Sequence, residues 1–297
     1  MRFGLLGTGP WAHLAHAPGL AAHDRVDFAG VWGRDPAKAA ALAGEYAVAT
    51  YPDVDALLAD VEAVAIALPP EVQGDLALRA AQAGKHLFLD KPVAMTAARA
   101  DEIARTVRDN ELRSVVYFTR RFLPELAGFL TSVAAEGGWI EARVDHVGTI
   151  FDEGNPFGAS PWRREKGGLW DVGPHALALV VPVLGPVVEV SAMVAARDMT
   201  HLTLRHSSGA VSKITLSVDV PPAAAREEAV LFGEAGVRPV PDPAWEPNLA
   251  YGNAVDALLA GDRAMDVTFG ASITAVLEAA ATSAASGQLV RVQRPER

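Results

Sequence analysis

Short apolar runs alternate with alanine-rich amphipathic stretches over the first part of the chain. The apolar runs predict strands at residues 3–6, 26–32, 47–51, 63–68, 86–89 and 114–118. The stretches between them predict helices at 10–22, 36–44, 53–58, 71–83 and 96–109. Several of these begin with Pro at the first position or with an N-cap such as Asp35. Strand–helix alternation with almost continuously apolar strands is typical of an α/β fold with a doubly wound parallel sheet.

The pattern changes after residue 120. A predicted helix at 124–136 is followed by longer segments in which apolar and polar residues alternate, at 139–150, 187–196, 200–206, 210–220 and 227–233. In the fourth of these, Ile214 and Leu216 fall on one side and Thr215 on the other, as in an antiparallel strand with one buried face. The apolar stretch 176–188 predicts a buried helix and then a strand. Two helices at 248–259 and 268–286 and a strand at 289–292 complete the prediction.

Length and charge narrow the class of protein. The chain has 297 residues, enough for two domains, and its 26 basic and 36 acidic residues give a net charge of −10. This acidity disfavours nucleic acid and anionic membranes, and we expect neither as a partner. The sequence contains no cysteine, which excludes disulfides and thiolate chemistry, and no metal-ligand motif, so we expect no metal. The apolar run before Gly7 is too short for a signal peptide, and we expect a cytoplasmic protein.

A glycine-rich loop follows the first predicted strand and opens the first predicted helix. Its residues Gly7-Thr8-Gly9-Pro10-Trp11-Ala12 match the G-x-G-x-x-A dinucleotide-binding pattern in the strand–loop–helix setting that the pattern requires. Gly7 allows the tight turn, Gly9 lets the backbone approach a pyrophosphate, and Ala12 allows close helix–strand packing. The alternative is a turn without a ligand. We predict an NAD(P)-binding Rossmann domain at 1–119 and a second, α+β domain at 120–297.

The second predicted strand ends near the position that reads the adenosine ribose. No acidic residue occupies its last position, Gly33 leaves room for a 2′-phosphate, and Arg34 can bind that phosphate. This pattern favours NADP(H) over NAD(H). In the alternative interpretation, Asp35 is only a helix N-cap and Arg34 a solvated side chain.

Candidate catalytic residues occur at two places in the sequence. Asp171 precedes His175 by four positions, and if this segment opens a helix, the two side chains share a face and can act on one small molecule. The structural alternatives are a helix N-cap for Asp171 ahead of Pro174 and a core histidine for His175. Lys91 follows a predicted strand, at the sheet edge where doubly wound folds bind ligands.

Several motifs occur in a fixed order: the glycine loop, 65–70 (AIALPP), 83–86 (AGKH), 90–92 (DKP), 118–122 (FTRRF), 162–163 (WR) and 167–175 (GGLWDVGPH). With these motifs the chain resembles the Gfo/Idh/MocA oxidoreductases, the glucose-fructose oxidoreductase and inositol dehydrogenase group, over essentially its whole length. The resemblance implies an active site between the domains. It also implies that 120–297 is a substrate-binding and oligomerisation domain with a large open, mostly antiparallel sheet, through which a homodimer or homotetramer forms.

The resemblance also implies roles for individual residues. Lys91 would hold the nicotinamide and the substrate hydroxyl, and His175, accompanied by Asp171, would be the general acid and base. The expected cofactor-binding residues are Gly7, Thr8, Gly9, Pro10, Trp11, Gly33, Arg34, Leu68, Pro69, Asp90 and Lys91. The expected substrate-binding residues are Arg120, Trp162 and Arg163, whose alternative role is packing and salt bridging.

The sequence departs from the family pattern at three positions. Asp90 stands in place of the usual Glu, Gln73 stands where a His is common, and Ala178 replaces an Asp that helps many members to bind polyols. A very polar polyol is therefore a less secure substrate for this chain.

We therefore expect an enzyme, an NADP(H)-dependent dehydrogenase or reductase that transfers hydride between nicotinamide and a CH-OH group or carbonyl. Its substrate would be a sugar, sugar nucleotide, cyclitol or related small molecule. One alternative is a redox-neutral enzyme that uses NAD in glycoside processing. The other is a non-catalytic nucleotide-binding regulator, against which the presence of Lys91, Asp171 and His175 argues.

Overall fold

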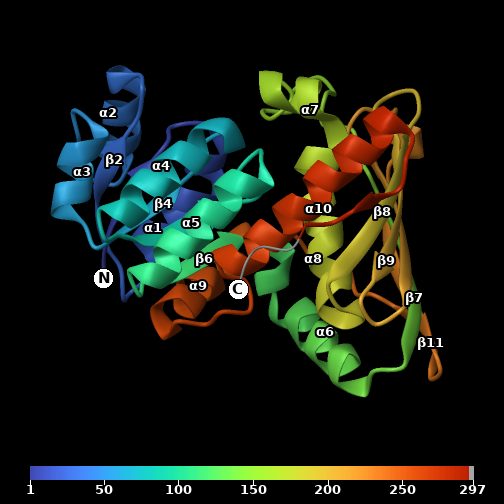
Figure 1. Cartoon of the computed structure of the whole chain (residues 1–297). Helices are drawn as coiled ribbons and strands as arrows, with labels where there is room; N and C mark the ends of the chain where they lie inside the picture. The colour runs from blue at the N-terminus through green and yellow to red at the C-terminus, as the bar shows by residue number, and fades with distance from the viewer. Residues whose placement is uncertain (294–297) are drawn as a thin grey trace. The chain divides into compact units, whose positions relative to one another are not determined.

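The computed structural model describes residues 1–293, and its contacts group the chain into two compact units (Figure 1). The first unit consists of Met1–Phe122 and Trp245–Ala271. The second consists of Leu123–Ala244 and the segment that begins at Ser272. The sequence pattern puts the segment Trp245–Ala271 into the second domain, whereas its contacts put it into the first unit.

Six strands form the sheet of the first unit, in the order β3-β2-β1-β4-β5-β6, and all neighbours are parallel. They are β1 (Arg2–Leu6), β2 (Asp27–Trp32), β3 (Ala49–Thr50), β4 (Ala63–Ile66), β5 (His86–Asp90) and β6 (Ser114–Tyr117). The connecting helices are α1 (Ala17–Ala22), α2 (Pro36–Glu45), α3 (Val54–Asp60), α4 (Pro70–Gln82) and α5 (Ala97–Asp109). The predicted doubly wound sheet is confirmed, and its central strands are buried on both faces as such a sheet requires.

The helix predicted at 10–22 is divided in the structure. A π-helical turn, η1 (Ala12–His16), precedes α1, and the N–H of Ala17 donates to the carbonyl of Ala12. Pro18 gives the physical reason, because it has no N–H to donate and its ring crowds the carbonyl of Leu14. A wider turn accommodates this conflict without ending the helix.

Helix α9 (Pro247–Ala260) packs on α1 and β6 and so belongs to the first unit. Its Tyr251 stacks on Phe88 with ring centroids 4.4 Å apart and meets the edge of His16 at 5.1 Å. Gly19 makes room for this ring, since a Cβ there would lie 2.2 Å from Cδ1 of Tyr251. The segment that returns from the far part of the chain thus completes a buried aromatic core.

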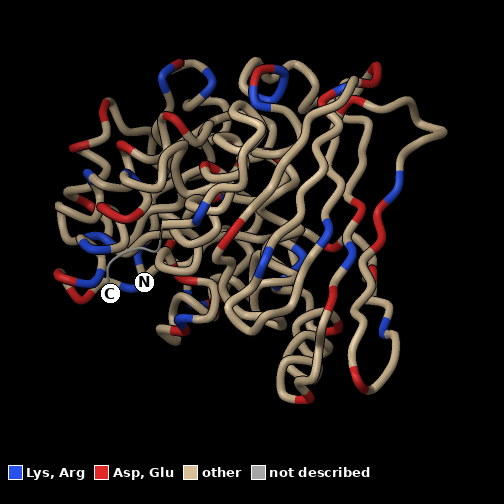
Figure 2. Tube along the Cα trace, turned by 45° about the vertical axis from the view of Figure 1, so that its right-hand side comes forward, with Lys and Arg blue, Asp and Glu red and all other residues tan. Residues whose placement is uncertain are grey.

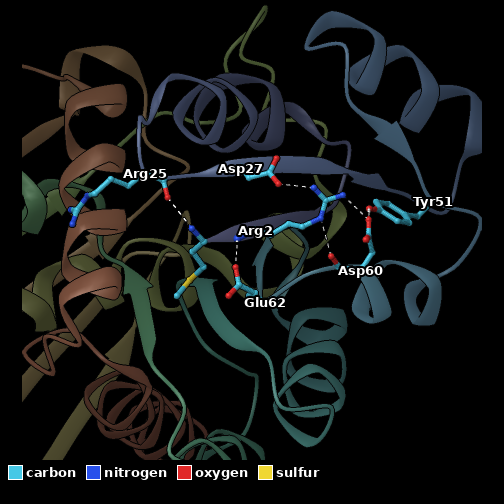
Figure 3. A network of polar contacts seen from close by, with 7 residues as sticks. Arg2, Arg25, Asp27, Tyr51, Asp60 and Glu62 are labelled. Carbon is cyan, nitrogen blue, oxygen red and sulfur yellow. Dashed lines mark hydrogen bonds and ion pairs between the residues drawn. The ribbon is translucent and has the colours of Figure 1, made fainter.

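A polar network around Arg2 joins the start of β1 to β2 and α3 (Figure 3). Arg2 donates to Asp27 at 2.6 Å and to Asp60 at 2.8 Å, and its backbone N–H donates to Glu62 at 2.7 Å. The hydroxyl of Tyr51 also donates to Asp60. These exposed contacts lie at the opposite end of β1 from the glycine loop, so they hold the strands together away from that loop.

The second unit contains a seven-stranded sheet in the order β12-β11-β7-β10-β9-β8-β13. Its strands are β7 (Trp139–Val147), β8 (Val187–Val194), β9 (Thr200–His206), β10 (Val211–Ser217), β11 (Arg226–Gly233), β12 (Gly236–Pro239) and β13 (Val290–Arg291). The pairs are antiparallel except β7 with β10, which are parallel. The predicted, mostly antiparallel sheet is confirmed, and β12 is an additional strand that the sequence pattern did not predict.

Helices of the second unit cover one face of this sheet. They are α6 (Pro124–Glu136), α7 (Pro161–Asp171), α8 (Gly173–Leu184) and the greater part of α10 (Val267–Ser286). The short turn η3 (Pro222–Ala224) follows β10, and η2 (Thr119–Phe122), which belongs to the first unit, precedes α6. On the strands, Lys and Arg are interspersed with Asp and Glu (Figure 2), as in the 2.7 Å pair of Arg143 with Glu141. Exposed apolar side chains also occur, and Met193 on β8 is 69% exposed.

Two helical stretches are long and apolar enough, by length and composition, to cross a membrane. These are the α7–α8 stretch Pro161–Leu184 and α10, Val267–Ser286. Their most apolar windows are 67% and 61% buried inside the protein, as is typical of core helices.

The predicted buried helix and strand at 176–188 are confirmed by α8 and β8.

Candidate active site

Candidate cofactor residues lie together at one edge of the first sheet. Gly7 follows β1, Gly33 follows β2, Leu68 lies just beyond β4 and Lys91 follows β5. Because these strands are parallel, their carboxyl ends share the edge at which doubly wound sheets bind ligands. The remaining predicted residues of this group lie at the same edge: Thr8, Gly9, Pro10, Trp11, Arg34, Pro69 and Asp90.

The glycine loop has the backbone geometry that its residues predict. Gly7 has a φ of +129°, and a Cβ there would lie only 2.4 Å from the carbonyl oxygen of Ala67. A Cβ at Gly9 would meet no atom within 4 Å, so the space over this residue is open. Ala12 is completely buried. The tight turn, the open approach and the close packing therefore occur at the three expected positions.

Three residues follow β2, namely Gly33, Arg34 and Asp35, and each has a different role. Asp35 is the N-cap of α2, because its Oδ1 accepts from the N–H groups of Ala37 at 3.0 Å and Lys38 at 3.2 Å. A Cβ at Gly33 would lie 2.7 Å from Cγ2 of Thr8, so packing against the glycine loop accounts for this glycine. Arg34 is exposed beside them and carries a charge at the edge of the candidate site.

Gln73 holds the turn that carries Lys91. Its Nε2 donates to the carbonyls of Asp90 at 2.7 Å and Pro92 at 2.9 Å, and its Oε1 accepts from the N–H of Asp90 at 2.9 Å. The carboxylate of Asp90 accepts from the backbone N–H of Lys91 at 2.8 Å. Gln73 is completely buried, so this clamp is shielded from water. The turn is thus fixed from both sides by side chains of the same unit.

Trp11 connects the glycine loop to the aromatic core of the first unit. Its ring stacks on Tyr117 at 6.1 Å and lies 6.1 Å from the ring of Trp245, tilted by 32°. Burial raises the pKa of Tyr117 well above its usual range, and the nearby Asp90 carboxylate adds to the effect. Trp11 therefore has a packing role, and its predicted cofactor contact stays a prediction.

Asp171 and His175 lie on two helices, which corrects the expectation that their segment opens one helix. Asp171 is the last residue of α7, Val172 separates the helices, and His175 is the third residue of α8. Pro174 is the reason, because it lacks the N–H that would donate to the carbonyl of Trp170 and its ring crowds that carbonyl. The N-cap of α8 is Val172, so the predicted capping alternative for Asp171 is also wrong.

Arg163 forms an ion pair with Asp171. The Nε of Arg163 donates to Oδ2 of Asp171 at 2.9 Å, and the two side chains are only 18% and 5% exposed. The guanidinium also lies over the ring of Trp162 at 4.8 Å and over that of Phe157 at 5.3 Å. Arg163 thus forms a salt bridge, and this pair fixes the carboxylate next to the start of α8. Its predicted contact with substrate stays a prediction.

The two glycines that begin the 167–175 motif fit tightly against the second sheet and the turn before β9. Gly167 has a φ of +64°, and a Cβ at Gly168 would lie 2.7 Å from the Cα of Ser217. Asp198, in the turn before β9, accepts from the N–H of Gly168 at 2.6 Å and also binds the hydroxyl of Ser217. Asp198 thereby fixes the end of α7 to the sheet.

His146 on β7 lies against His175. Their rings stack with centroids 6.0 Å apart and an interplanar angle of 25°. His146 lies directly opposite Glu227 of β11 in the sheet register, and Nδ1 of His146 is 3.5 Å from Oε1 of Glu227. An imidazole that stacks on a second, carboxylate-paired imidazole is restricted in orientation. The ring of His146, in the same unit, thus restricts the orientation of the His175 ring.

The other predicted positions are placed as follows. Arg120 lies in η2, after β6, at the carboxyl edge of the first sheet. Ala178 is completely buried in α8, so this position contributes packing. Among residues 1–293, no group of three or more His, Asp or Glu side chains could hold a metal ion.

Sequence reasoning missed Gln73, Asp198 and His146 as parts of the site. In the sequence Gln73 is only a departure from the family pattern, because its clamp depends on contacts between α4 and the turn after β5. Asp198, in the turn between β8 and β9, and His146, on β7, contact residues that are distant from them in sequence.

Comparison with known families gives one match for each part of the chain. Residues 1–118 match the GFO_IDH_MocA family, described as an oxidoreductase family with an NAD-binding Rossmann fold. Residues 142–237 match the GFO/IDH/MocA C-terminal domain. The first match covers the six-stranded sheet, and the second lies in the part of the chain that forms the seven-stranded sheet.

Curated relatives are 28–36% identical to the chain over the segments that match. An uncharacterized oxidoreductase, sll0816, of Synechocystis sp. is 29% identical over 63% of this chain, which spans about half (52%) of that relative. The dTDP-3,4-didehydro-2,6-dideoxy-alpha-D-glucose 3-reductase of Streptomyces antibioticus is 28% identical over 80% of this chain and 74% of its own. D-xylose 1-dehydrogenase (NADP(+)) 2 of Haloferax volcanii is 29% identical over 100% of this chain and 93% of its own.

Solved structures share the fold at lower identity. The WlbA dehydrogenase from Bordetella pertussis, in complex with NADH and UDP-GlcNAcA, superposes with a TM-score of 0.83 at 21% identity. The superposition covers 99% of both chains. At this identity the likeness establishes the two-domain fold alone.

Proposed function

Because the chain belongs to the Gfo/Idh/MocA oxidoreductase family, we propose that it transfers hydride between NADP(H) and a hydroxyl or carbonyl of a sugar or sugar nucleotide. Its curated relatives include a reductase of a dTDP-sugar and an NADP-dependent xylose dehydrogenase. The single observation that carries the proposal is the glycine loop, with its positive φ at Gly7 and open space over Gly9. A cyclitol or another small hydroxylated ring is the next substrate class.

The residues at the carboxyl edge of the first sheet fit a dinucleotide. The open space over Gly9, just before η1, would admit a pyrophosphate. Arg34 is exposed at the end of β2 and supplies a positive charge for a 2′-phosphate, which supports NADP(H) over NAD(H). Bound nicotinamide would supply or accept the hydride. Leu68, Pro69 and Asp90 would line the same edge.

Lys91 and His175 are proposed as the catalytic residues. The Lys91 ammonium, on a turn fixed by Gln73, would stabilise the negative charge that develops on the reacting oxygen. The His175 imidazole would exchange the proton of the same hydroxyl, since imidazole gains and loses protons near neutral pH. Asp171 would act indirectly, because its ion pair with Arg163 fixes the chain just before α8. Arg120 and Trp162 are proposed to contact the substrate.

A steady-state assay with NADPH and NADH and a panel of keto-sugars, sugars and sugar nucleotides tests the proposal. Replacement of His175 or Lys91 by Ala should lower kcat by about 10²- to 10⁴-fold, as for loss of a general acid–base group. His201→Ala and Lys38→Met are matched controls, because both side chains are exposed on other elements. Wild-type turnover in both catalytic variants would contradict the mechanism, and turnover without net NADPH consumption would favour a redox-neutral reaction.

A homodimer or homotetramer formed through the second sheet is part of the proposal. It is supported by exposed apolar side chains on strands of that sheet, where Ile140 is 64%, Met193 69% and Val237 55% exposed. Light scattering coupled to gel filtration should give a mass two or four times that of the chain. A monomer at micromolar concentration would contradict it. The cytoplasmic location stays a prediction.

A further inference from the structure

A cavity lies in the first unit, at the edge of the sheet opposite the candidate cofactor residues. Its volume is about 340 Å³, and its lining residues belong to Met1–Phe122 or Trp245–Ala271. They come from the end of α5, the start of β6 with the loop before it, and the turn that leads from α9 into α10. Small-molecule sites in proteins have volumes of roughly 300–1,000 Å³, so this cavity is large enough for one compact ligand.

The length of β6 separates this cavity from the candidate active site. Ser114, the first residue of β6, lines the cavity, whereas Tyr117 at the other end of the strand is in register with Asp90. The two ends of this short strand are roughly 10 Å apart. The glycine loop follows β1, which lies further along the sheet in the order β1-β4-β5-β6. A ligand bound here would therefore be distinct from the cofactor.

Three arginines line the cavity: Arg108, Arg113 and Arg263. Among residues 1–293, the closest carboxylate contact of the three is that of Arg108 with its exposed neighbour Asp109, at 3.8 Å. Arg113 donates to the backbone carbonyl of Leu259 at 2.5 Å, and within the same residues the side chain of Arg263 forms neither a hydrogen bond nor an ion pair. The other arginines of α5 are paired, as Arg105 is with Asp101 at 3.3 Å. The cavity thus presents three guanidinium groups, none of which forms a short ion pair.

Three acidic residues also line the cavity: Glu111, Asp262 and Asp266. Two of them stabilise the turn between α9 and α10. Oδ1 of Asp262 accepts from the N–H of Ala264 at 2.9 Å, and Oδ1 of Asp266 accepts from the N–H of Phe269 at 3.0 Å. Glu111 is exposed. Because carboxylate oxygens accept from hydroxyl groups, the cavity offers donors for an anion together with acceptors for hydroxyls.

The walls of the cavity are held by hydrogen bonds between segments that are distant in sequence. The N–H of Val116 donates to the carbonyl of Met265 at 2.8 Å. The N–H of Val267 donates to Oγ of the buried Ser114 at 3.1 Å. Both bonds connect β6 to the turn before α10. Walls that are already ordered lower the entropic cost of binding a ligand.

We propose that this cavity binds a small phosphate monoester that carries hydroxyl groups, either a sugar phosphate or a nucleoside monophosphate. The planar guanidinium groups of the three arginines would donate to the phosphate oxygens. Hydroxyl groups of the ligand would donate to carboxylate oxygens of Glu111 and Asp262. A neutral sugar has no charge for the arginines, and inorganic phosphate lacks the hydroxylated part that the carboxylates would bind. This inference does not depend on the proposed function.

Calorimetric titration of the full chain tests the proposal with glucose 6-phosphate, AMP and inorganic phosphate. Excess NADPH is present, so that AMP does not occupy the glycine loop. Wild type should bind at least one ester more tightly than inorganic phosphate, and the tighter ester identifies the source of the phosphate. Arg108→Gln and Arg263→Gln should each weaken this binding by about tenfold to a hundredfold, as for loss of a charge-assisted hydrogen bond. Arg105→Gln is the matched control, because Arg105 also lies on α5 but does not line the cavity.

A stability measurement separates binding from a structural role. Arg263→Gln should unfold at the wild-type temperature, because its side chain has no partner among residues 1–293 to lose. A large fall in its Tm, equal ester binding in wild type and both arginine variants, or displacement of the ester by glucose would each overturn the proposal. So would tightest binding of inorganic phosphate, or no binding of either ester at millimolar concentration. Failure of wild type to bind NADPH would contradict the proposed function alone, since binding of glucose 6-phosphate is measurable without it.

Discussion

Two glycines of the first unit differ in what a methyl group would meet. At Gly7 a Cβ would lie 2.4 Å from a backbone carbonyl, and the φ of +129° is one that other residues rarely adopt. At Gly44, inside α2, a Cβ would meet no atom within 4 Å. The same substitution should therefore have opposite effects at the two positions.

Gly7→Ala should destabilise the protein by about 1–3 kcal/mol and abolish measurable NADPH binding, because the turn has to distort. Gly44→Ala should be neutral or stabilise by up to about 1 kcal/mol, since alanine favours a helix interior. Chemical unfolding and titration with NADPH measure both effects. Equal stability and equal binding in the two variants would show that the glycine loop is not strained.

His146 is a positioning residue whose effect should depend on its ring. His146→Ala removes the ring that stacks on His175, and an aromatic pair contributes about 0.5–1.5 kcal/mol, so kcat/KM should fall by about twofold to tenfold. His146→Phe keeps the ring and should retain most of the activity, although it loses Glu227 as a partner. If His146→Phe is as impaired as His146→Ala, the imidazole itself is required rather than its ring.

At the scale of elements, prolines and glycines decide where helices break. The sequence pattern predicts one continuous helix around Pro18 and another around Pro174. In the structure each of these stretches is divided into two helical segments. The helix α7 was not predicted, because its interior contains Gly167 with a φ of +64° and the adjacent Gly168. The long helices α5 and α6, which carry clear start signals, match their predicted ranges almost to the residue.

Asp198 should be the most sensitive position among the contacts that fix α7. Asp198→Ala leaves the N–H of Gly168 without its acceptor and removes a partner of Ser217, which should lower the free energy of unfolding by about 1–3 kcal/mol. The exposed Asp152→Ala is the control. Thermal unfolding compares them. A Tm for Asp198→Ala equal to that of Asp152→Ala would mean that β10 alone fixes this helix.

At the scale of the whole molecule, local patterns predicted both sheets but not every partner within them. Short-range periodicity identifies strands, whereas the parallel pair β7 with β10 depends on residues about 70 positions apart, such as Glu141 and Val211. The candidate residues follow the same rule. Gly7 and Asp35 were predicted from their neighbours in sequence, whereas the contacts of Gln73 and His146 depend on packing between elements.

Acid should destabilise the first unit through His16. This residue is completely buried, and burial lowers its pKa from 6.5 to about 3. The unfolded chain therefore binds a proton that the folded chain refuses, so stability is full above pH 6.5 and is lost as the pH falls towards 3. Through this residue alone, the protein should be about 3 kcal/mol less stable at pH 4 than at pH 7.

Chemical unfolding at pH 7 and pH 4 measures this dependence. His16→Gln removes the titrating group and should lose less stability between the two pH values than wild type. His13→Gln, whose side chain is 41% exposed, should behave as wild type. If all three proteins lose the same stability in acid, carboxylates rather than His16 determine the acid limit.

The return of Trp245–Ala271 to the first unit has a consequence for how the protein is made. On the ribosome, the strands up to residue 122 emerge long before α9, and 271 minus 122 leaves 149 residues still to be synthesised. At 5–20 residues per second this is a delay of roughly 7–30 s. During that time Phe88 and Tyr117 lack the tyrosine that covers them. The first unit therefore begins to emerge first but is complete only after α9 has been synthesised. Until then, the nascent chain has to shield an aromatic surface while the residues of the second sheet are being synthesised.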